Sequence, residues 1–269
     1  MKVCKIIATY FGQRTERDFN FRHRKRAPWP SHRQFSCGPE GVLSMIKDQI
    51  SIETDVDAGV ECDTIIVNNR SGFKEGEDYV RSINGQKTRS GGIISIEMDN
   101  IGGQFGSYDR AYSEFAGKYD YWILNEDDIV ITGYHYYKKL IDKNESCYAI
   151  IGIVYPSVYD RRVPLHAAGA ALLLHKDVLE QIKKINGKLP HPVINSYKAR
   201  VRDGEIAWSQ RIEELGYKIV YTGLERWDHE VNYCLPYREL IERFFTVENF
   251  KQSEFYRGVG WLPARLECQ

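Results

Sequence analysis

The sequence has no excess of charge of either sign, because its 37 Lys and Arg residues balance its 37 Asp and Glu residues. General nucleic-acid-binding proteins are usually basic overall, so this balance argues against that class. The sequence also lacks a long apolar run, and the longest candidate, Ala167 to Leu174, is far shorter than the roughly 20 residues that cross a bilayer. We therefore expect no transmembrane segment and no nucleic-acid partner.

No Cys-x-x-Cys pair is present among the six cysteines, which argues against a structural zinc site. The cysteines are scattered along the chain, as is usual for reduced thiols in a cytosol-like compartment. No signal peptide is apparent, because the N-terminal residues lead directly into a strand-like run. We expect a cytoplasmic protein, with peripheral contact to a membrane left open.

What the sequence does contain is a series of short apolar runs that alternate with amphipathic stretches. Its 269 residues fit one large α/β domain or two small ones. The pattern predicts strands near 3–9, 63–67, 93–98, 121–124, 148–155 and 217–221, and helices over 39–52, from 104, over 134–142, over 176–185 and after Asp203. Strands that alternate with helices favour an α/β fold built on a central sheet.

An acidic cluster, Glu126, Asp127 and Asp128, directly follows the apolar run 121–124. We call these three residues the acid motif. Carboxylates between two apolar runs repel one another and are costly to bury without partners. Hard oxygen ligands suit Mg²⁺ or Mn²⁺, and ligands of open α/β sheets bind beyond the carboxyl ends of the strands. The alternative is a strand end whose charges face water.

Polar or glycine-rich residues follow three other predicted strands. Thr9 and Tyr10 end the first strand, where a nucleotide base would be able to stack. Asn68 and Asn69 are predicted to form a turn after the second strand. After the third strand comes Asp99-Asn100-Ile101-Gly102-Gly103, which precedes a helix expected to begin near Gln104 and to favour an anion at its N-terminus. This glycine pattern matches neither a Walker loop nor the Rossmann fingerprint, and an ordinary turn is the alternative at each place.

A strongly basic stretch occupies residues 13–36, with seven Arg and Lys side chains. Pro28 and Pro30 interrupt it, so a long helix is not expected. We interpret it as a loop between the first strand and the first helix. Such a loop would suit a phosphate or an anionic membrane surface, and a solvated loop without a partner is the alternative.

Taken in order, these motifs resemble a GT-A glycosyltransferase, most closely the inverting glycosyltransferase family 2. Four features carry the resemblance: a first strand that ends in Thr9-Tyr10, the Asp99–Gly103 element, the acid motif after a Tyr-Asp-Tyr-Trp-Ile-Leu strand, and Asp203-Gly204-Glu205 followed later by Gly-Tyr-Lys-Ile. It implies a mixed central sheet flanked by helices. It also implies a catalytic domain over 1–233, with a nucleotide-binding half to about 130 and an acceptor half over 131–233, followed by a helical extension over 234–269.

The resemblance also implies roles for individual residues. Asp128 would bind Mn²⁺ or Mg²⁺, and His229 would lie near the metal or the diphosphate. Glu205 would be the catalytic base that deprotonates the acceptor hydroxyl. The nucleotide-sugar donor would contact Thr9, Tyr10, Asn68, Asn69, Asp99, Asn100, Gly103, Glu126 and Asp127. Two departures from the family pattern are Asn68-Asn69, where an acid is common, and Gly204-Glu205 in place of Glu-Asp.

The implied function is metal-dependent transfer of a sugar from a nucleotide-diphosphate donor to a hydroxyl of a glycan or lipid-linked acceptor. A UDP-sugar is favoured as the donor, and a GDP-sugar is the other possibility. Inversion at the anomeric centre and a role in polysaccharide synthesis are expected. A retaining GT-A enzyme and a non-catalytic nucleotide-sugar-binding module are alternatives. A nucleotidyltransferase is a third alternative, although Tyr10-Phe11-Gly12-Gln13 has one glycine where that class usually has a glycine-rich loop.

Overall fold

A computed structural model describes residues 1–12, 38–127, 129–131, 135–145, 150–152, 167, 172–194, 196, 199–221 and 234–236. Its central feature is a seven-stranded sheet with the strand order β3-β2-β1-β4-β7-β6-β8. Strand β1 therefore lies near the middle of the sheet, between two strands that come much later in the sequence.

The first four strands of the sheet are parallel to one another: β1 (Val3–Tyr10), β2 (Cys62–Asn69), β3 (Ile93–Met98) and β4 (Tyr121–Glu126). Strand β7 (Leu172–His175) is antiparallel to β4 and also to β6 (Ile150–Gly152), which runs parallel to β8 (Ile219–Tyr221). A separate two-stranded sheet pairs β5 (Ile129–Ile131) with β9 (Cys234–Pro236). The sheet is thus mixed, as predicted.

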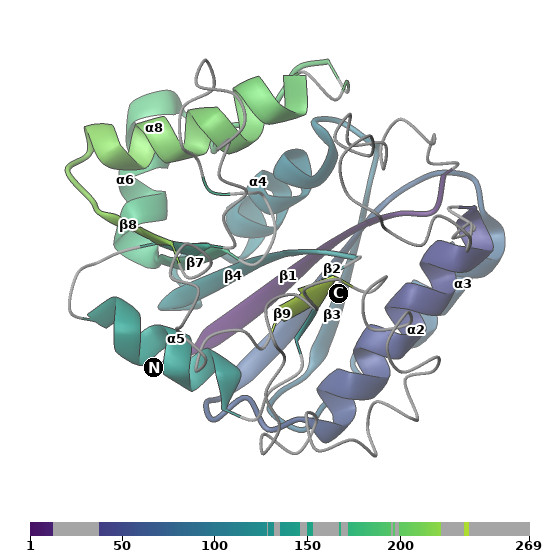
Figure 1. Cartoon of the computed structure of the whole chain (residues 1–269). Helices are drawn as coiled ribbons and strands as arrows, with labels where there is room; N and C mark the ends of the chain where they lie inside the picture. The colour runs from purple at the N-terminus through teal and green to yellow at the C-terminus, as the bar shows by residue number, and fades with distance from the viewer. Residues whose placement is uncertain are drawn as a thin grey trace, which may run out of the picture.

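Helices cover both faces of the sheet and make a three-layer arrangement (Figure 1). One face carries α4 (Gly103–Phe115), α6 (Lys176–Asn186), the π-helix η1 (Arg200–Ile206) and α8 (Ala207–Glu214). The opposite face carries α2 (Pro39–Asp55), α3 (Lys74–Ser82) and α5 (Tyr136–Glu145). The predicted α/β class with helices on both sides of a central sheet is confirmed.

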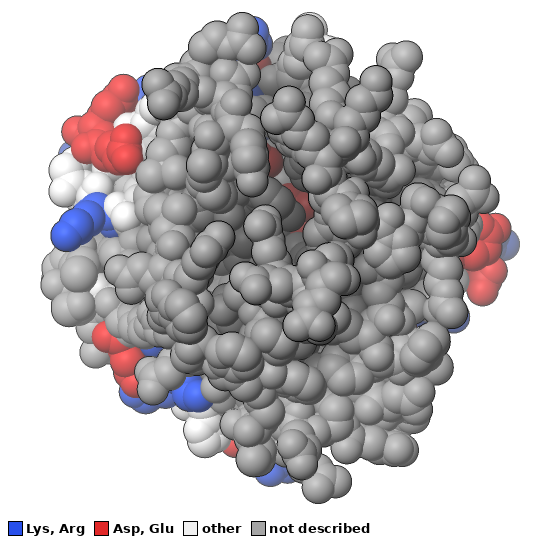
Figure 2. Space-filling model, viewed as in Figure 1, with Lys and Arg blue, Asp and Glu red and all other residues white. Residues whose placement is uncertain are grey.

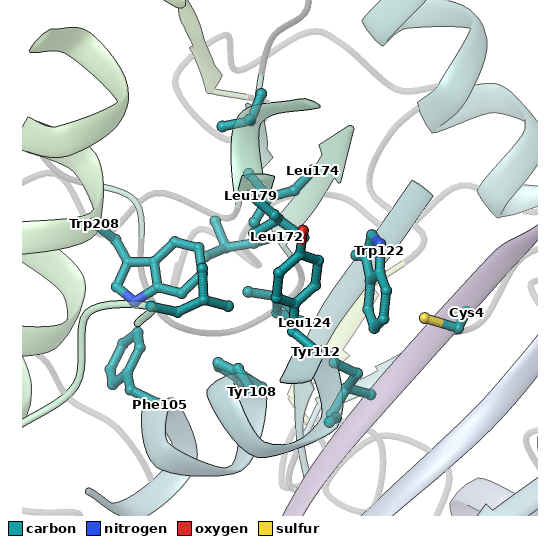
Figure 3. Packing of buried hydrophobic residues seen from close by; sticks show 14 of the residues in the cluster. Cys4, Phe105, Tyr108, Tyr112, Trp122, Leu124, Leu172, Leu174, Leu179 and Trp208 are labelled. Carbon is teal, nitrogen blue, oxygen red and sulfur yellow. The ribbon is translucent and has the colours of Figure 1, made fainter. Parts of the chain in front are cut away.

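Alternation along the strands divides the core between the two faces, because successive side chains of a strand point to opposite sides. On the α4 face, Trp122 packs edge-on against Tyr112, with ring centroids 5.0 Å apart, and against Tyr119 at 5.4 Å. Phe105 and Trp208 continue this aromatic cluster (Figure 3). On the α2 face, the neighbouring residues Ile7 and Ile66 pack against aliphatic side chains of α2.

Two local predictions were wrong. Asn68 and Asn69 are not turn residues but the last residues of β2, where pairing with Thr9 and Tyr10 of β1 satisfies their backbone. The helix expected after Asp203 begins earlier, because Asp203 lies inside η1, which begins at Arg200. Arg202 binds the Asp203 carboxylate at 2.7 Å and lowers its pKa, so the side chain is engaged away from a capping position.

None of the described helices is both long enough and apolar enough to cross a membrane. Described acidic and basic side chains lie next to one another around the outline of the molecule in Figure 2, in keeping with the balanced net charge. Ion pairs between partly or fully exposed side chains include Lys138 with Asp142 and Arg110 with Glu114.

Candidate functional site

Polar side chains converge at the carboxyl ends of the parallel strands β1, β2 and β4. The strand register places Thr9 beside Asn68, and Ala8 beside Glu126. This edge of an open α/β sheet is where such folds bind ligands. The structure therefore brings together five of the residues selected from the sequence: Thr9, Asn68, Asn69, Glu126 and Asp127.

Asp127 is buried, with 2% of its surface exposed, and Thr9 Oγ1 donates a hydrogen bond to its Oδ2 at 3.1 Å. A buried carboxylate is costly unless it is hydrogen-bonded or bound to a cation. For this residue, the alternative of a solvated strand end is therefore wrong. Tyr10, next in the chain after Thr9, is half-buried, and its ring lies so close to Gly12 that a Cβ there would fall 2.1 Å from it.

Glu126 is half-buried and accepts a hydrogen bond from Gln104 Nε2 to its Oε1 at 2.5 Å. Gln104 belongs to the first turn of α4, whose free backbone N–H groups point to the same edge of the sheet. The helix can start there because Gly102 adopts a left-handed backbone conformation with φ of 76°. The sequence had placed the start of this helix correctly but gave no sign that Gln104 would hold Glu126.

The Asp99–Gly103 element folds back on α4, and a Cβ on Gly106 would fall 1.8 Å from the carbonyl oxygen of Ile101. Gly103 is buried as the first residue of the helix. Asp99 instead lies at the outside, with its side chain 75% exposed and 3.8 Å from Arg70. Among the predicted donor contacts of this element, Gly103 is thus buried at the start of α4, and Asp99 is at the surface.

Adjacent asparagines at the end of β2 have opposite environments. Asn69 faces α4, and its Nδ2 donates to the Thr9 carbonyl oxygen at 3.1 Å and to Ser107 Oγ at 2.8 Å. Asn68 faces the α2 side and is fully buried, yet neither its Nδ2 nor its Oδ1 has a hydrogen-bond partner among the described residues. Leaving such an amide unpaired costs about 1–3 kcal/mol.

Glu205 lies in η1, half-buried, and its carbonyl oxygen accepts a hydrogen bond from Ser209 Oγ at 3.0 Å. Its neighbour Gly204 packs on Phe105, since a Cβ at Gly204 would fall 2.3 Å from that ring. Phe105 directly follows Gln104, the residue that binds Glu126. Consecutive residues of α4 therefore touch the acid motif and the segment of Glu205. Short π-helical stretches are frequent at functional sites.

The predicted metal ligands Asp128 and His229 lie outside the described residues. Within the part of the chain that the structure describes, no group of three or more His, Cys, Asp or Glu side chains is arranged to hold a metal. A closed protein cage for zinc or calcium is therefore not supported there.

Sequence reasoning missed Gln49 of α2, which is 1% exposed and donates from Nε2 to the carbonyl oxygens of Glu126, at 3.3 Å, and Asp127. A signal was present, because Gln49 lies next to Ile50 on the apolar side of a helix whose inner positions include Val42 and Ile46. A polar side chain among buried positions is expected to have a specific polar partner.

Comparisons with known proteins found no matching family model and no related curated protein. Solved structures with a similar arrangement include a 4-diphosphocytidyl-2C-methyl-D-erythritol synthase from Anaerococcus prevotii (12% identity, 82% of this chain and 86% of that one, TM-score 0.42). A protein from Bacillus anthracis provisionally assigned as a glucose-1-phosphate thymidylyltransferase is 9% identical (82% and 87% covered, TM-score 0.44). One from Desulfovibrio desulfuricans, provisionally assigned as a nucleotide-diphospho-sugar transferase, is 11% identical (92% and 97% covered, TM-score 0.46). Likeness at this level does not identify a shared function.

Proposed function

We propose that this chain is a metal-dependent glycosyltransferase of the GT-A type, which moves a sugar from a nucleotide-diphosphate donor to an acceptor hydroxyl with inversion. The donor is a UDP-sugar in preference to a GDP-sugar, and the metal is Mn²⁺ or Mg²⁺. The strand order supports a site at the carboxyl edge of β1, β2 and β4, and the resemblance of the motifs in sequence supports the chemistry.

The observation that carries the proposal is the buried, unpartnered amide of Asn68 beside Thr9 at this edge. A side-chain amide offers one acceptor and two donor hydrogens, which is the complement of the polar edge of a nucleobase. Binding a base there would satisfy an amide that has no hydrogen-bond partner among the described residues, and the free energy of that new hydrogen bonding would add to ligand affinity.

In the proposed reaction, Glu205 takes the proton of the acceptor hydroxyl while that oxygen attacks the anomeric carbon. Gln104 holds the Glu126 carboxylate, and Thr9 holds that of Asp127, so both acids are oriented before the donor arrives. A bound divalent cation would supply neutralisation of the charge on the leaving nucleoside diphosphate, and Asp128 would hold it.

The acceptor is proposed to be a glycan or a lipid-linked hydroxyl, and the setting the cytoplasm or the cytoplasmic side of a membrane. Two buried cysteines, Cys4 and Cys62, are free thiols, as a reducing compartment would leave them. Burial raises the pKa of both thiols, so neither is a candidate nucleophile.

The test is a donor screen with UDP-, GDP-, CMP- and dTDP-sugars, in the presence of Mn²⁺ or of EDTA, with release of the nucleotide as the readout. Wild type would be compared with Asp128→Ala and with Asp142→Ala, a control in which an exposed carboxylate of α5 is removed. We expect one donor to be cleaved only with metal, by wild type and by the control, but not by Asp128→Ala.

Three outcomes would contradict the proposal or one part of it. Release of pyrophosphate from a nucleoside triphosphate and a sugar phosphate would assign the site to nucleotidyl transfer. Metal-dependent nucleotide binding without turnover of any donor, even with an acceptor library, would indicate a non-catalytic binding module. An α-linked product from an α-linked donor would replace inversion by retention.

A further inference from the structure

A row of polar side chains runs through the otherwise aliphatic layer between the sheet and α2. It consists of Lys5, Gln49, Glu53, Asn125 and Tyr137, which we call the polar column. Its members come from β1, α2, β4 and α5. The column begins at the middle of β1 and ends beneath the acid motif, so it connects the interior with the proposed catalytic edge.

At its lower end, the column is anchored by an ion pair between Lys5 Nζ and Glu53 Oε1 at 2.6 Å. Lys5 is only 1% exposed, and Tyr137 donates a second hydrogen bond to Glu53 at 3.1 Å. Buried ion pairs seldom add stability compared with apolar residues of similar volume. Their presence in this layer therefore calls for a reason other than stability.

At its upper end, Gln49 connects this ion pair to the backbone of the acid motif. Gln49 Oε1 accepts from Lys5 Nζ at 3.4 Å, which fixes the orientation of the amide. Its Nε2 then faces the carbonyl oxygens of Glu126 and Asp127 and donates to both. Asn125 Nδ2 also donates to the Glu126 carbonyl oxygen, at 3.0 Å.

This support lies where the ladder pairing of β4 ends. In the described residues, β4 pairs with β7 as far as Leu124 and with β1 as far as Glu126. The following residue, Asp127, is a turn residue that leads to β5. A backbone that leaves a sheet needs new hydrogen-bond partners when it is buried, and a side chain of α2 provides one here.

We propose that Gln49 is a positioning residue for the acid motif, held in its orientation by Lys5 and Glu53. By fixing the carbonyl groups of Glu126 and Asp127, it sets the direction in which the carboxylates leave the strand end. This role in metal and donor binding rests on the proposed function, whereas the effect on the backbone does not. Gln49 is not expected to touch donor, metal or acceptor.

The experiment compares wild type with Gln49→Glu and Gln49→Met. Glu keeps the oxygen that faces Lys5 but replaces the donor by an acceptor, and Met removes both interactions at similar volume. The matched control is Ile46→Val, which loosens packing on the same helix without touching the acid motif. Thermal melting would show whether each variant folds. If Gln49→Glu does not fold, the test is made with Gln49→Met alone.

The first readout is hydrogen exchange of metal-free protein in a peptide that covers residues 125–131. We expect both Gln49 variants to exchange about tenfold faster there, with Ile46→Val changed no more than the rest of the core. The second readout is calorimetric titration of Mn²⁺ in the presence of UDP, for which we expect affinity to fall about tenfold in the Gln49 variants, as for one lost buried hydrogen bond.

The inference would be overturned if the Gln49 variants matched Ile46→Val both in hydrogen exchange over residues 125–131 and in affinity for Mn²⁺. Gln49 would then act only through packing. A wild type that binds no Mn²⁺ with UDP would instead overturn the proposed function. In that event, the exchange readout would still decide whether Gln49 holds the backbone at the end of β4.

Discussion

The two faces of the central sheet are built from alternate residues of the same strands, yet their interiors differ in kind. The α4 face is lined by aromatic rings around Trp122, and its buried Asn69 and Ser107 are hydrogen-bonded to each other. The α2 face has an aliphatic core that is interrupted by the polar column and by the buried side chains of Thr9, Asn68 and Asp127. The packing of the first face mainly stabilises the fold. The buried polar groups of the second face carry a cost in stability that the first face largely avoids.

The largest effect is expected from Trp122→Ala on the aromatic face, because Trp122 is fully buried among Tyr112, Tyr119 and Cys4. Loss of a buried Trp costs about 3–5 kcal/mol, so the free energy of unfolding in urea should fall by this amount. Affinity for nucleotide in the protein that stays folded should change little. A change near zero in the free energy of unfolding would show that the aromatic packing on this face contributes little to stability.

A somewhat smaller effect is expected from Lys5→Met on the opposite face, since it leaves the Glu53 carboxylate without its cation. Breaking a buried pair from one side costs about 3 kcal/mol or more. The double variant Lys5→Met with Glu53→Gln removes the uncompensated charge, and we expect it to regain more than half of the loss in urea unfolding. Additive losses would mean that the two residues do not form a coupled pair.

Asn68 and Asn69 allow the comparison to be made between neighbours. Asn69→Leu should cost about 1–2 kcal/mol, because it breaks hydrogen bonds to Thr9 and Ser107. Asn68→Leu should instead stabilise the free protein by about 1 kcal/mol and abolish nucleotide binding, since it removes an unpaired buried amide. Thermal melting with and without UDP measures both quantities. Equal destabilisation by the two variants would remove the case for a ligand at Asn68.

The smallest effect concerns pH and lies at the opposite end of the sheet from the site. A hydrogen bond from the Lys176 ammonium, at 2.9 Å, and one from the Lys2 backbone lower the pKa of Asp120. A lowered carboxyl pKa adds stability above the ordinary value near about pH 4 and loses it as the pH falls through the folded value. Asp120→Asn should therefore be slightly less stable at pH 7, with the difference from wild type vanishing under strong acid, in urea titrations across pH. A difference that grows in acid would have the wrong sign for this cause.

Much of the fold was predictable in the N-terminal half, because the spacing of apolar residues and the positions of turn residues there indicate the same strands and helices. The strand over Ile93–Met98 was predicted with its observed bounds, and the start of α4 was predicted to within one residue. Placing Thr9 near the acid motif required one further rule, that strand ends of an α/β sheet meet at one edge.

What the sequence could not provide were contacts between positions far apart in the chain. Nothing local in Asn68 and Asn69 distinguishes a partnered amide from an unpartnered one, since only alternation across the finished sheet separates them. Gly204, in the π-helical turn at Asp203, packs against Phe105, and this contact joins residues about a hundred positions apart. The polar column joins β1, α2, β4 and α5, and no single periodic pattern contains it.

The central position of β1 has a consequence in time. Thr9 is made before Asp127, whose carboxylate it binds and which follows 118 residues later. At about 5–20 residues per second, the first strand waits several seconds for its neighbour β4. Until β2 is made, both edges of this apolar strand are unpaired, and the edge that later pairs with β4 stays open to wrong partners for longer. Parallel strands that are far apart in the sequence also pair slowly during folding. Aggregation of nascent or truncated chains should therefore depend on how soon β1 pairs with β2.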